Sequence, residues 1–218
     1  IDYIIVAHNV GDISLNSNQV NTLPSLASKV KAGLKIKNPN CVAYDILFGC
    51  PGWVEGVIQA QAFIKAGMAK KCLVIGADTL SRVLDHSDRD SMIYADGAGA
   101  TMIEETLDEG GILSHKTVSY TSEGEAEFIF YGPANDKGAG TQYIKMFGRK
   151  VYEFALSKVP LAIQSCLEAS GEPIDDVKKI FIHQANLKMD EVIVKRFYRL
   201  YKMSMPDDVL PMNIQEFG

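Results

Sequence analysis

Short apolar runs that suit buried strands alternate in this chain with stretches whose apolar residues recur at helical spacing. Residues 2–9 (DYIIVAHN), 41–49 (CVAYDILFG) and 71–78 (KCLVIGAD) are such runs, and the third is apolar almost throughout. A continuous apolar run suits a strand covered on both faces of its sheet. Helical spacing follows the first two runs, at 23–34 and 52–69. The alternation predicts an α/β fold with a largely parallel sheet and right-handed crossovers.

The middle of the chain continues with strands and then loses its periodicity. Residues 91–105 and 111–121 are expected to form two further strands, joined by an acidic turn. Residues 121–147 are rich in Gly, Asn, Pro and Asp and show no clear period. They are therefore predicted to be a long connection.

A second set of elements follows this connection. Helices are predicted at 148–170 and 187–201, and between them 179–186 (KIFIHQAN) is predicted to be a strand that runs into a loop. The order of elements begins to repeat that of the first part. We therefore expect an N-terminal half at 1–120, a connection at 121–147 and a C-terminal half at 148–218.

Composition excludes several classes of protein. The 218 residues are 47% hydrophobic and 22% charged, as in ordinary globular proteins, and the net charge of −5 does not favour a nucleic-acid or anionic-membrane surface. Residues 1–10 have too short an apolar core for a signal peptide or membrane span. The four dispersed cysteines indicate a reducing cytoplasm. They share no zinc-binding interval with the four histidines, so no metal site is expected.

Cys50 ends the second apolar run and is followed at once by Pro51 and Gly52. This order places the thiol beside the first turn of a helix, where free N–H groups and the helix dipole favour thiolate. Pro51 suits a first helical turn, and Gly52 permits close approach of a ligand. Two interpretations stay open at this stage: a reactive nucleophile, or a small hydrophobic residue that fills a tight turn.

His183 follows the last predicted strand directly and precedes Gln184, Ala185 and Asn186. Open α/β sheets place ligand sites at the carboxyl ends of their strands. An imidazole there can act as a base or polarise a carbonyl, although a strand-end histidine is often only a loop residue. Together with Cys50 it forms a plausible nucleophile–histidine pair.

Three segments carry a resemblance to a known family. They are residues 44–52 (YDILFGCPG), 70–103 (KKCLVIGADTLSRVLDHSDRDSMIYADGAGATMI) and 181–189 (FIHQANLKM). In this order they resemble the β-ketoacyl-acyl-carrier-protein synthase III family of condensing enzymes. The resemblance implies a thiolase-like α/β fold of two similar halves, layered α-β-α-β-α, in a cytoplasmic homodimer.

The resemblance also implies a reaction. Cys50 would accept an acyl group from acyl-CoA, and decarboxylation and Claisen condensation with malonyl-acyl-carrier-protein would initiate fatty acid biosynthesis. His183 would stabilise the enolate. Acyl-CoA is then a substrate, and no tightly bound cofactor is expected.

The same resemblance implies a binding path for coenzyme A. Arg89 would lie on or near the adenine, and Gly148, Asn186 and Lys188 would line the pantetheine or phosphate path. Arg149 would add a positive charge at its mouth.

The chain departs from the family at three places. The family's catalytic Asn follows a Gly in a GN[TS] turn, but here the sequence ends at Gly218. The family's first strand–helix unit is also missing. We therefore expect an incomplete member of the family, apparently truncated at both ends: a shortened chain, a proteolysed core or a pseudo-enzyme, whose activity stays open. Pro51 stands where the family commonly has Ala or another small residue, which suggests an altered subgroup or acyl preference.

Two alternatives stay open. The chain is a non-catalytic partner that binds acyl groups or carrier protein, or it is a related condensing enzyme of polyketide or 3-hydroxy-3-methylglutaryl-CoA synthase type.

Overall fold

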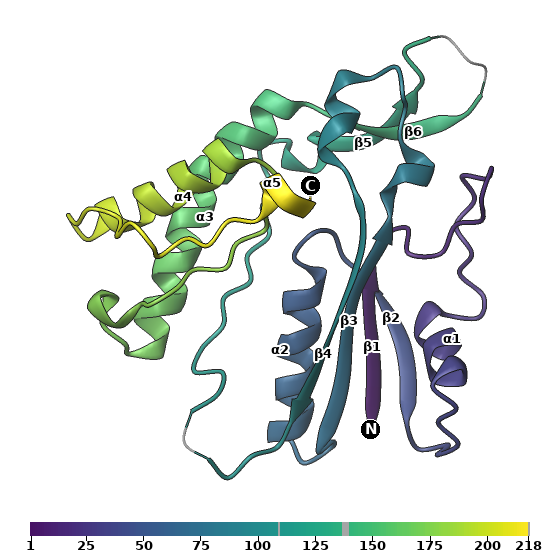
Figure 1. The fold of residues 1–218 in the computed structure, drawn as a ribbon, viewed down its shortest axis with the longest axis horizontal. Coiled ribbons are helices and arrows are strands. Elements are labelled where there is room, and N and C mark those ends of the chain that lie inside the picture. The colour runs from purple at the N-terminus through teal and green to yellow at the C-terminus, as the bar shows by residue number, and fades with distance from the viewer. Residues whose placement is uncertain (109, 137–139, 218) are drawn as a thin grey trace. The chain divides into compact units, whose positions relative to one another are not determined.

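The protein is described from a computed structural model that covers residues 1–108, 110–136 and 140–217. Within these residues the chain forms two compact units (Figure 1). Unit 1 contains residues 1–83 and the described part of 95–111, and unit 2 contains 84–94 and the described residues from 112 onward. Residues 84–94 and 112–120, expected in the N-terminal half, thus belong to unit 2. The expectation about Gly218 lies outside the described residues.

Unit 1 is built on one sheet whose strands lie in the order β2-β1-β3-β4. The strands are β1 (Tyr3–His8), β2 (Val42–Leu47), β3 (Lys71–Thr79) and β4 (Asp96–Glu104). β1 pairs in parallel with β2 and β3, whereas β4 runs antiparallel to β3. The prediction of a largely parallel sheet is confirmed for these strands.

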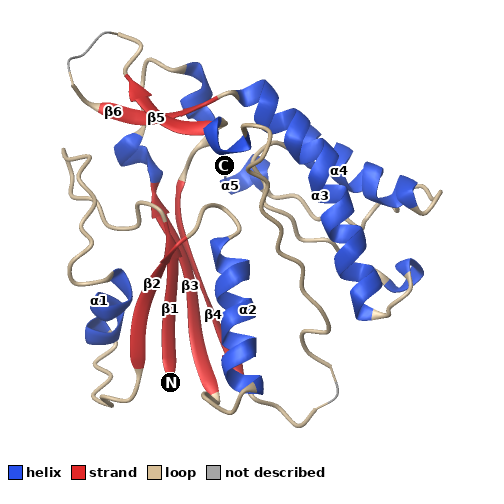
Figure 2. Ribbon diagram, turned by 180° about the vertical axis from the view of Figure 1, so that it is seen from behind, coloured by secondary structure: helices blue, strands red, loops and turns tan. Residues whose placement is uncertain are grey.

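Two helices cover the two faces of this sheet (Figure 2). They are α1 (Leu26–Gly33) and α2 (Gly52–Lys65). Alternate residues of β1 point to opposite faces, as a strand requires. Ile4 clusters with Ala27 of α1, whereas Ile5 clusters with Ala60 of α2. The central strand is therefore buried on both sides, in agreement with its apolar sequence.

Glycines allow α2 to approach the sheet closely. A Cβ on Gly56 would lie 2.8 Å from Val74 Cγ1, and one on Gly52 would lie 3.0 Å from Ala7 Cβ. Gly76 of β3 in turn makes room for Trp53 of α2. The Trp53 Cβ lies 3.1 Å from the position that a Cβ on Gly76 would occupy. Gly52 thus serves contact with β1, and the approach of a ligand there stays a prediction.

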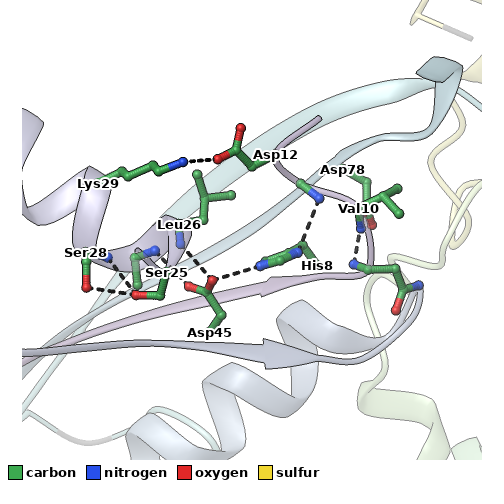
Figure 3. A network of polar contacts seen from close by, with 12 residues as sticks. His8, Val10, Asp12, Ser25, Leu26, Ser28, Lys29, Asp45 and Asp78 are labelled. Carbon is green, nitrogen blue, oxygen red and sulfur yellow. Dashed lines mark hydrogen bonds and ion pairs between the residues drawn. The ribbon is translucent and has the colours of Figure 1, made fainter. Parts of the chain in front are cut away.

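A carboxylate inside the sheet fixes the start of α1. Asp45 of β2 accepts hydrogen bonds from the Leu26 and Ala27 amides, both at 2.7 Å, and lies 3.0 Å from His8 Nε2 (Figure 3). Ser25 caps the helix by accepting from the Ser28 amide. Asp45 therefore satisfies amides that the first turn of a helix leaves unpaired, and it ties β1, β2 and α1 together.

Unit 2 combines a hairpin with packed helices. Its elements are β5 (Ile129–Pro133), β6 (Gln142–Met146), α3 (Gly148–Ser170), α4 (Leu187–Leu200) and the short α5 (Ile214–Phe217). Short 3₁₀ helices also occur in the chain: η1 (Leu80–Val83), η2 (Arg89–Ile93), η3 (Glu125–Glu127) and η4 (Ile174–Asp176). The core of unit 2 contains Val194, Phe197, Tyr198 and Val209.

Three predictions for unit 2 are wrong. The stretch 121–147, expected to be a connection, contains the antiparallel β5–β6 hairpin. The strands expected at 111–121 and 179–186 are absent from the described residues, because no neighbouring strand pairs with them there. The Ile180 amide makes one isolated bond to the Val209 carbonyl. An apolar run becomes a strand only where a partner supplies the ladder of hydrogen bonds.

The contact between α2 and the sheet predicts a difference between two glycine substitutions. Gly56→Ala should lower the free energy of unfolding by about 1–3 kcal/mol because the added methyl overpacks against Val74. Gly33→Ala is the control: no atom lies within 4 Å of its Cβ position, so it should be neutral or stabilise by about 0.5–1 kcal/mol. Urea denaturation measures both. Equal effects of the two substitutions would contradict this account of the packing.

Candidate functional site

Cys50 lies in the turn between β2 and α2 and is exposed. The turn is closed by the Gly52 amide, which donates to the Gly49 carbonyl at 2.7 Å. Pro51 occupies the N-cap position with φ of −81°, so α2 begins at Gly52. The close contact of Gly52 with Ala7 fixes this helix end against β1. The thiol is therefore presented at a rigid helix start, as the sequence predicts, and is not buried filler of the turn.

The electrostatics of Cys50 differ from the prediction. The pKa of its thiol is raised, mainly because surrounding protein atoms weaken the hydration of the sulfur, although the residue as a whole is exposed. A hydrogen bond from its own backbone lowers the pKa, and the Asp78 carboxylate raises it. Asp78 is held in place by the amides of Asn9 and Val10, at 3.0 and 2.7 Å (Figure 3). Desolvation is the largest of these contributions and sets the direction of the shift.

In unit 2, Lys145 of β6 lies at the centre of a buried polar cluster. Its ammonium group donates to Asp85, to Asp88 Oδ2 at 2.9 Å and to Asn135 Oδ1 at 3.1 Å. Asp85 also accepts from the Ser87 hydroxyl at 2.6 Å and from the Asn135 amide at 2.8 Å. Lys145 and Asp85 are both buried. The cluster ties residues 85–88 to the hairpin.

This cluster anchors the segment that carries Arg89. Arg89 is exposed and is the first residue of η2, whose N-cap is Asp88. Gly148 begins α3 nearby: a Cβ on it would lie 3.5 Å from Asp90 Oδ2. The structure thus brings together the segment of Arg89 and the start of α3, two regions that the predicted coenzyme A path requires. Arg149 follows Gly148 and is almost fully exposed, with Nε 2.8 Å from Glu153 Oε1.

The remaining predicted residues lie at the start of α4. His183 and Lys188 are exposed. Asn186 is the N-cap of α4, and its side-chain oxygen accepts from the Met189 amide at 3.0 Å. Gln184 fixes the segment by accepting from the amides of Asn213 and Ile214, at 2.9 and 3.0 Å. The Asn186 oxygen therefore has a structural role that the sequence prediction did not include. Pairing of Cys50 with His183 joins residues of different units and stays a prediction.

Sequence reasoning missed the buried charges Asp85, Lys145 and Asp190. The run LDHSDRD holds three aspartates within six residues, which is a signal for a structured acidic turn. Nothing in the sequence pairs that turn with Lys145, sixty residues further on.

Among the described residues no group of three or more His, Cys, Asp or Glu side chains is arranged to hold a metal ion. In the same part of the chain, no helix has both the length and the apolar character needed to cross a bilayer.

Comparison with known proteins places the chain in a family. Residues 44–121 match the family 3-oxoacyl-[acyl-carrier-protein (ACP)] synthase III. The β-ketoacyl-[acyl-carrier-protein] synthase III of Streptococcus sanguinis is 30% identical over the full chain, and that of Acholeplasma laidlawii is 34% identical. The chain belongs to the β-ketoacyl-acyl-carrier-protein synthase III family. It spans 64% and 63% of the length of these two relatives.

Solved structures of synthase III enzymes agree with the predicted thiolase-like fold, which is confirmed. The enzyme from Thermus thermophilus matches 98% of this chain with a TM-score of 0.81 and 28% identity. The enzyme from Aquifex aeolicus matches 100% of the chain with a TM-score of 0.79, also at 28% identity. This chain covers 62% and 63% of those two structures.

The raised pKa of Cys50 predicts how fast its thiol reacts. Alkylation by iodoacetamide, followed by mass spectrometry of the Cys50 peptide, should quicken steadily with pH and reach half its maximal rate above the pH of a free cysteine. Asp78→Asn should move that midpoint to lower pH, because it removes a charge that raises the pKa but keeps an acceptor for the amides. If the alkylation rate instead reached its maximum below pH 7, the result would indicate a thiolate stabilised by the helix.

The Lys145 cluster predicts a stability that depends on pH. The pKa values of Asp85 and Asp88 are lowered, chiefly by hydrogen bonds from Lys145. Such groups stabilise the fold above their unfolded pKa, about 4, and lose this contribution as pH falls through their folded pKa values. Lys145→Met should therefore lower the urea midpoint strongly at pH 7, and this effect should shrink progressively as the pH falls below about 4.

Lys178→Met is the matched control for this experiment. Lys178 lies 4.0 Å from Asp176, and both side chains are exposed, so this pair should contribute little. If the two substitutions lowered the midpoint equally at pH 7, the buried cluster would not have the anchoring role assigned to it.

Proposed function

We propose that the protein of which this chain forms part or all condenses an acyl-CoA primer with malonyl-acyl-carrier-protein through a thioester on Cys50. The observation that carries the proposal is the place of Cys50, exposed at the start of α2 and within the residues that match the family. Its relatives are named as β-ketoacyl-[acyl-carrier-protein] synthases III. The reaction would initiate fatty acid biosynthesis.

The first step is acyl transfer. The Cys50 sulfur attacks the thioester carbonyl of acyl-CoA, a new carbon–sulfur bond forms, and coenzyme A leaves as the thiolate. The proton of the Cys50 thiol passes to the leaving sulfur or to solvent. Because the pKa of the Cys50 thiol is raised, the reaction must include removal of this proton. The Cys50 amide would donate a hydrogen bond to the oxyanion that develops on the carbonyl oxygen.

The second step is condensation. Malonyl-acyl-carrier-protein loses CO₂, and the electron pair of the broken bond forms an enolate on the remaining thioester. The enolate carbon attacks the acyl carbonyl on Cys50, and the Cys50 thiolate leaves to regenerate the enzyme. His183 would donate a hydrogen bond to the enolate oxygen, a role that its exposed imidazole suits.

Coenzyme A would bind along the residues that the resemblance indicates. Arg89 would contact the adenine, and Gly148, Asn186 and Lys188 would line the path of the pantetheine and phosphates, with Arg149 at its mouth. Support comes from the fixed position of the Arg89 segment and its closeness to Gly148. We further propose a cytoplasmic homodimer with no tightly bound cofactor.

Separating the two steps tests this function. The intact protein is incubated with acetyl-CoA and malonyl-acyl-carrier-protein, and both CoA release and β-ketoacyl product are followed. His183→Ala should lower product formation by about 10²–10⁴-fold, the usual contribution of a positioned acid–base group, while acylation in the absence of malonyl substrate persists. Lys178→Met should leave both rates unchanged.

Two outcomes would overturn the proposal. Undiminished product formation by His183→Ala would remove His183 from the reaction. Saturable coenzyme A binding by the intact protein with neither CoA release nor product would favour the non-catalytic binding partner instead.

A further inference from the structure

Arg89 is a free guanidinium within an acidic stretch of the chain. Asp85, Asp88 and Asp90 all lie within four residues of it. Yet the exposed Arg89 side chain forms neither an ion pair nor a hydrogen bond with any other residue in the described part of the chain. Guanidinium groups bind carboxylates readily, often through two parallel hydrogen bonds. Another group in the fold therefore keeps these aspartates from Arg89.

Two of the three carboxylates are bound by the buried ammonium group of Lys145. It donates to Asp85 and to Asp88 Oδ2, the latter at 2.9 Å. Asp88 Oδ1 also accepts from the Asp90 amide at 3.0 Å, as the N-cap of η2. The third carboxylate, that of Asp90, lies near the start of α3, with Oδ2 3.5 Å from the Cβ position of Gly148. Lys145 is thus the cation that keeps two of the three carboxylates engaged.

Asp88 depends on Lys145 more than Asp85 does. The pKa values of both carboxyls are lowered, chiefly by hydrogen bonds from Lys145, although the charge of Asp85 acts to raise that of Asp88. Asp85 has further donors, the Ser87 hydroxyl at 2.6 Å and the Asn135 amide at 2.8 Å. Asp88 has no second cationic partner among the described residues, and its side chain is 21% exposed. Without the ammonium group, its carboxylate would be free to pair with the guanidinium of the next residue.

We propose that Lys145 is a positioning residue for Arg89: by binding the neighbouring carboxylates, its buried ammonium group keeps the Arg89 guanidinium free to bind the nucleotide part of coenzyme A. The proposal rests on the proposed function, because it takes Arg89 as a residue that contacts coenzyme A. A guanidinium that no carboxylate neutralises suits an anionic ligand, since its donors match phosphate oxygens. Lys145 is itself buried and acts only through Arg89.

A double-mutant cycle on coenzyme A binding tests the proposal. The Kd of the intact protein for coenzyme A is measured by isothermal titration calorimetry for the parent, Arg89→Ala, Lys145→Met and the double variant. Arg89→Ala and Lys145→Met should each raise the Kd about tenfold, the effect of losing one charge-assisted hydrogen bond. In the Arg89→Ala background no guanidinium is left to position, so Lys145→Met should change the Kd less than about twofold.

A rescue variant separates this role from the contribution of the cluster to stability. Lys145→Met lowers the urea midpoint, and a general loss of fold would also weaken binding. Asp88→Asn removes the competing carboxylate but keeps an acceptor for the Asp90 amide, since Asn caps helices as well as Asp does. Combined with Lys145→Met, it should restore the Kd to within about threefold of the parent value, while the urea midpoint stays below that of the parent.

Two single variants keep the test decisive even if Lys145→Met does not fold. Asp88→Asn alone leaves Lys145 paired with Asp85, and it should keep the Kd for coenzyme A or lower it, because a competitor for Arg89 is removed. Weaker binding by Asp88→Asn would overturn the proposal. Lys178→Met is the control and should leave the Kd unchanged.

The outcomes separate this proposal from the proposed function. If Arg89→Ala leaves the Kd unchanged, the coenzyme A contact assigned to Arg89 falls, and the proposal falls with it. If Arg89→Ala weakens binding but Lys145→Met does not, or weakens it equally in both backgrounds, Lys145 has only a structural role. The contact of Arg89 with coenzyme A would then stand without the proposal.

Discussion

The position of Cys50 depends on how closely helix α2 approaches the sheet beneath it. Helix and sheet backbones can come this near only where side chains are missing, and Gly52, Gly56 and Gly76 supply that space. The contact of Gly52 with Ala7 fixes the first turn of the helix against β1. The turn that carries the thiol therefore has a rigid element on each side. This precision suits a nucleophile, because misplacement by an ångström is costly in catalysis.

Buried charges in unit 2 differ in how completely they are paired. Lys145 and its carboxylate partners satisfy one another, so this cluster stabilises the fold and holds the segment of Arg89. Asp190 is fully buried, and neither of its carboxyl oxygens has a hydrogen-bond partner among the described residues.

The sequence predicts most of unit 1 because its signals are local. The apolar runs at β1 and β3 and the helical spacing of α2 are visible in short windows, and Ser25 marks the start of α1. The strand expected at 179–186 failed for a physical reason, since its apolar run has no paired neighbour in the described structure. The β5–β6 hairpin was missed because the alternating pattern of its short strands is obscured by the turn-forming residues of the same stretch, which are typical of a loop. The first error concerns pairing with a distant segment, which no local window contains, whereas the hairpin pairs neighbouring segments.

The candidate site divides in the same way. The exposed turn of Cys50 and the approach of the Arg89 segment to Gly148 follow from motifs that the sequence displays. The raised pKa of Cys50 does not, because the helix dipole is a local effect and desolvation depends on the tertiary surroundings. Asp190 is also invisible to sequence reasoning. From sequence alone, an aspartate in the first turn of a helix is expected to be solvated, and only the structure shows that Asp190 is buried.

The central claim is that Cys50 carries the acyl group, and mass spectrometry of the protein after brief exposure to acetyl-CoA tests it most directly. The account predicts a single added acetyl group, located by proteolysis on the peptide that contains Cys50. This adduct should be lost on treatment with hydroxylamine and absent from Cys50→Ala. An adduct that persists in Cys50→Ala, or one located on Cys166, would contradict the account.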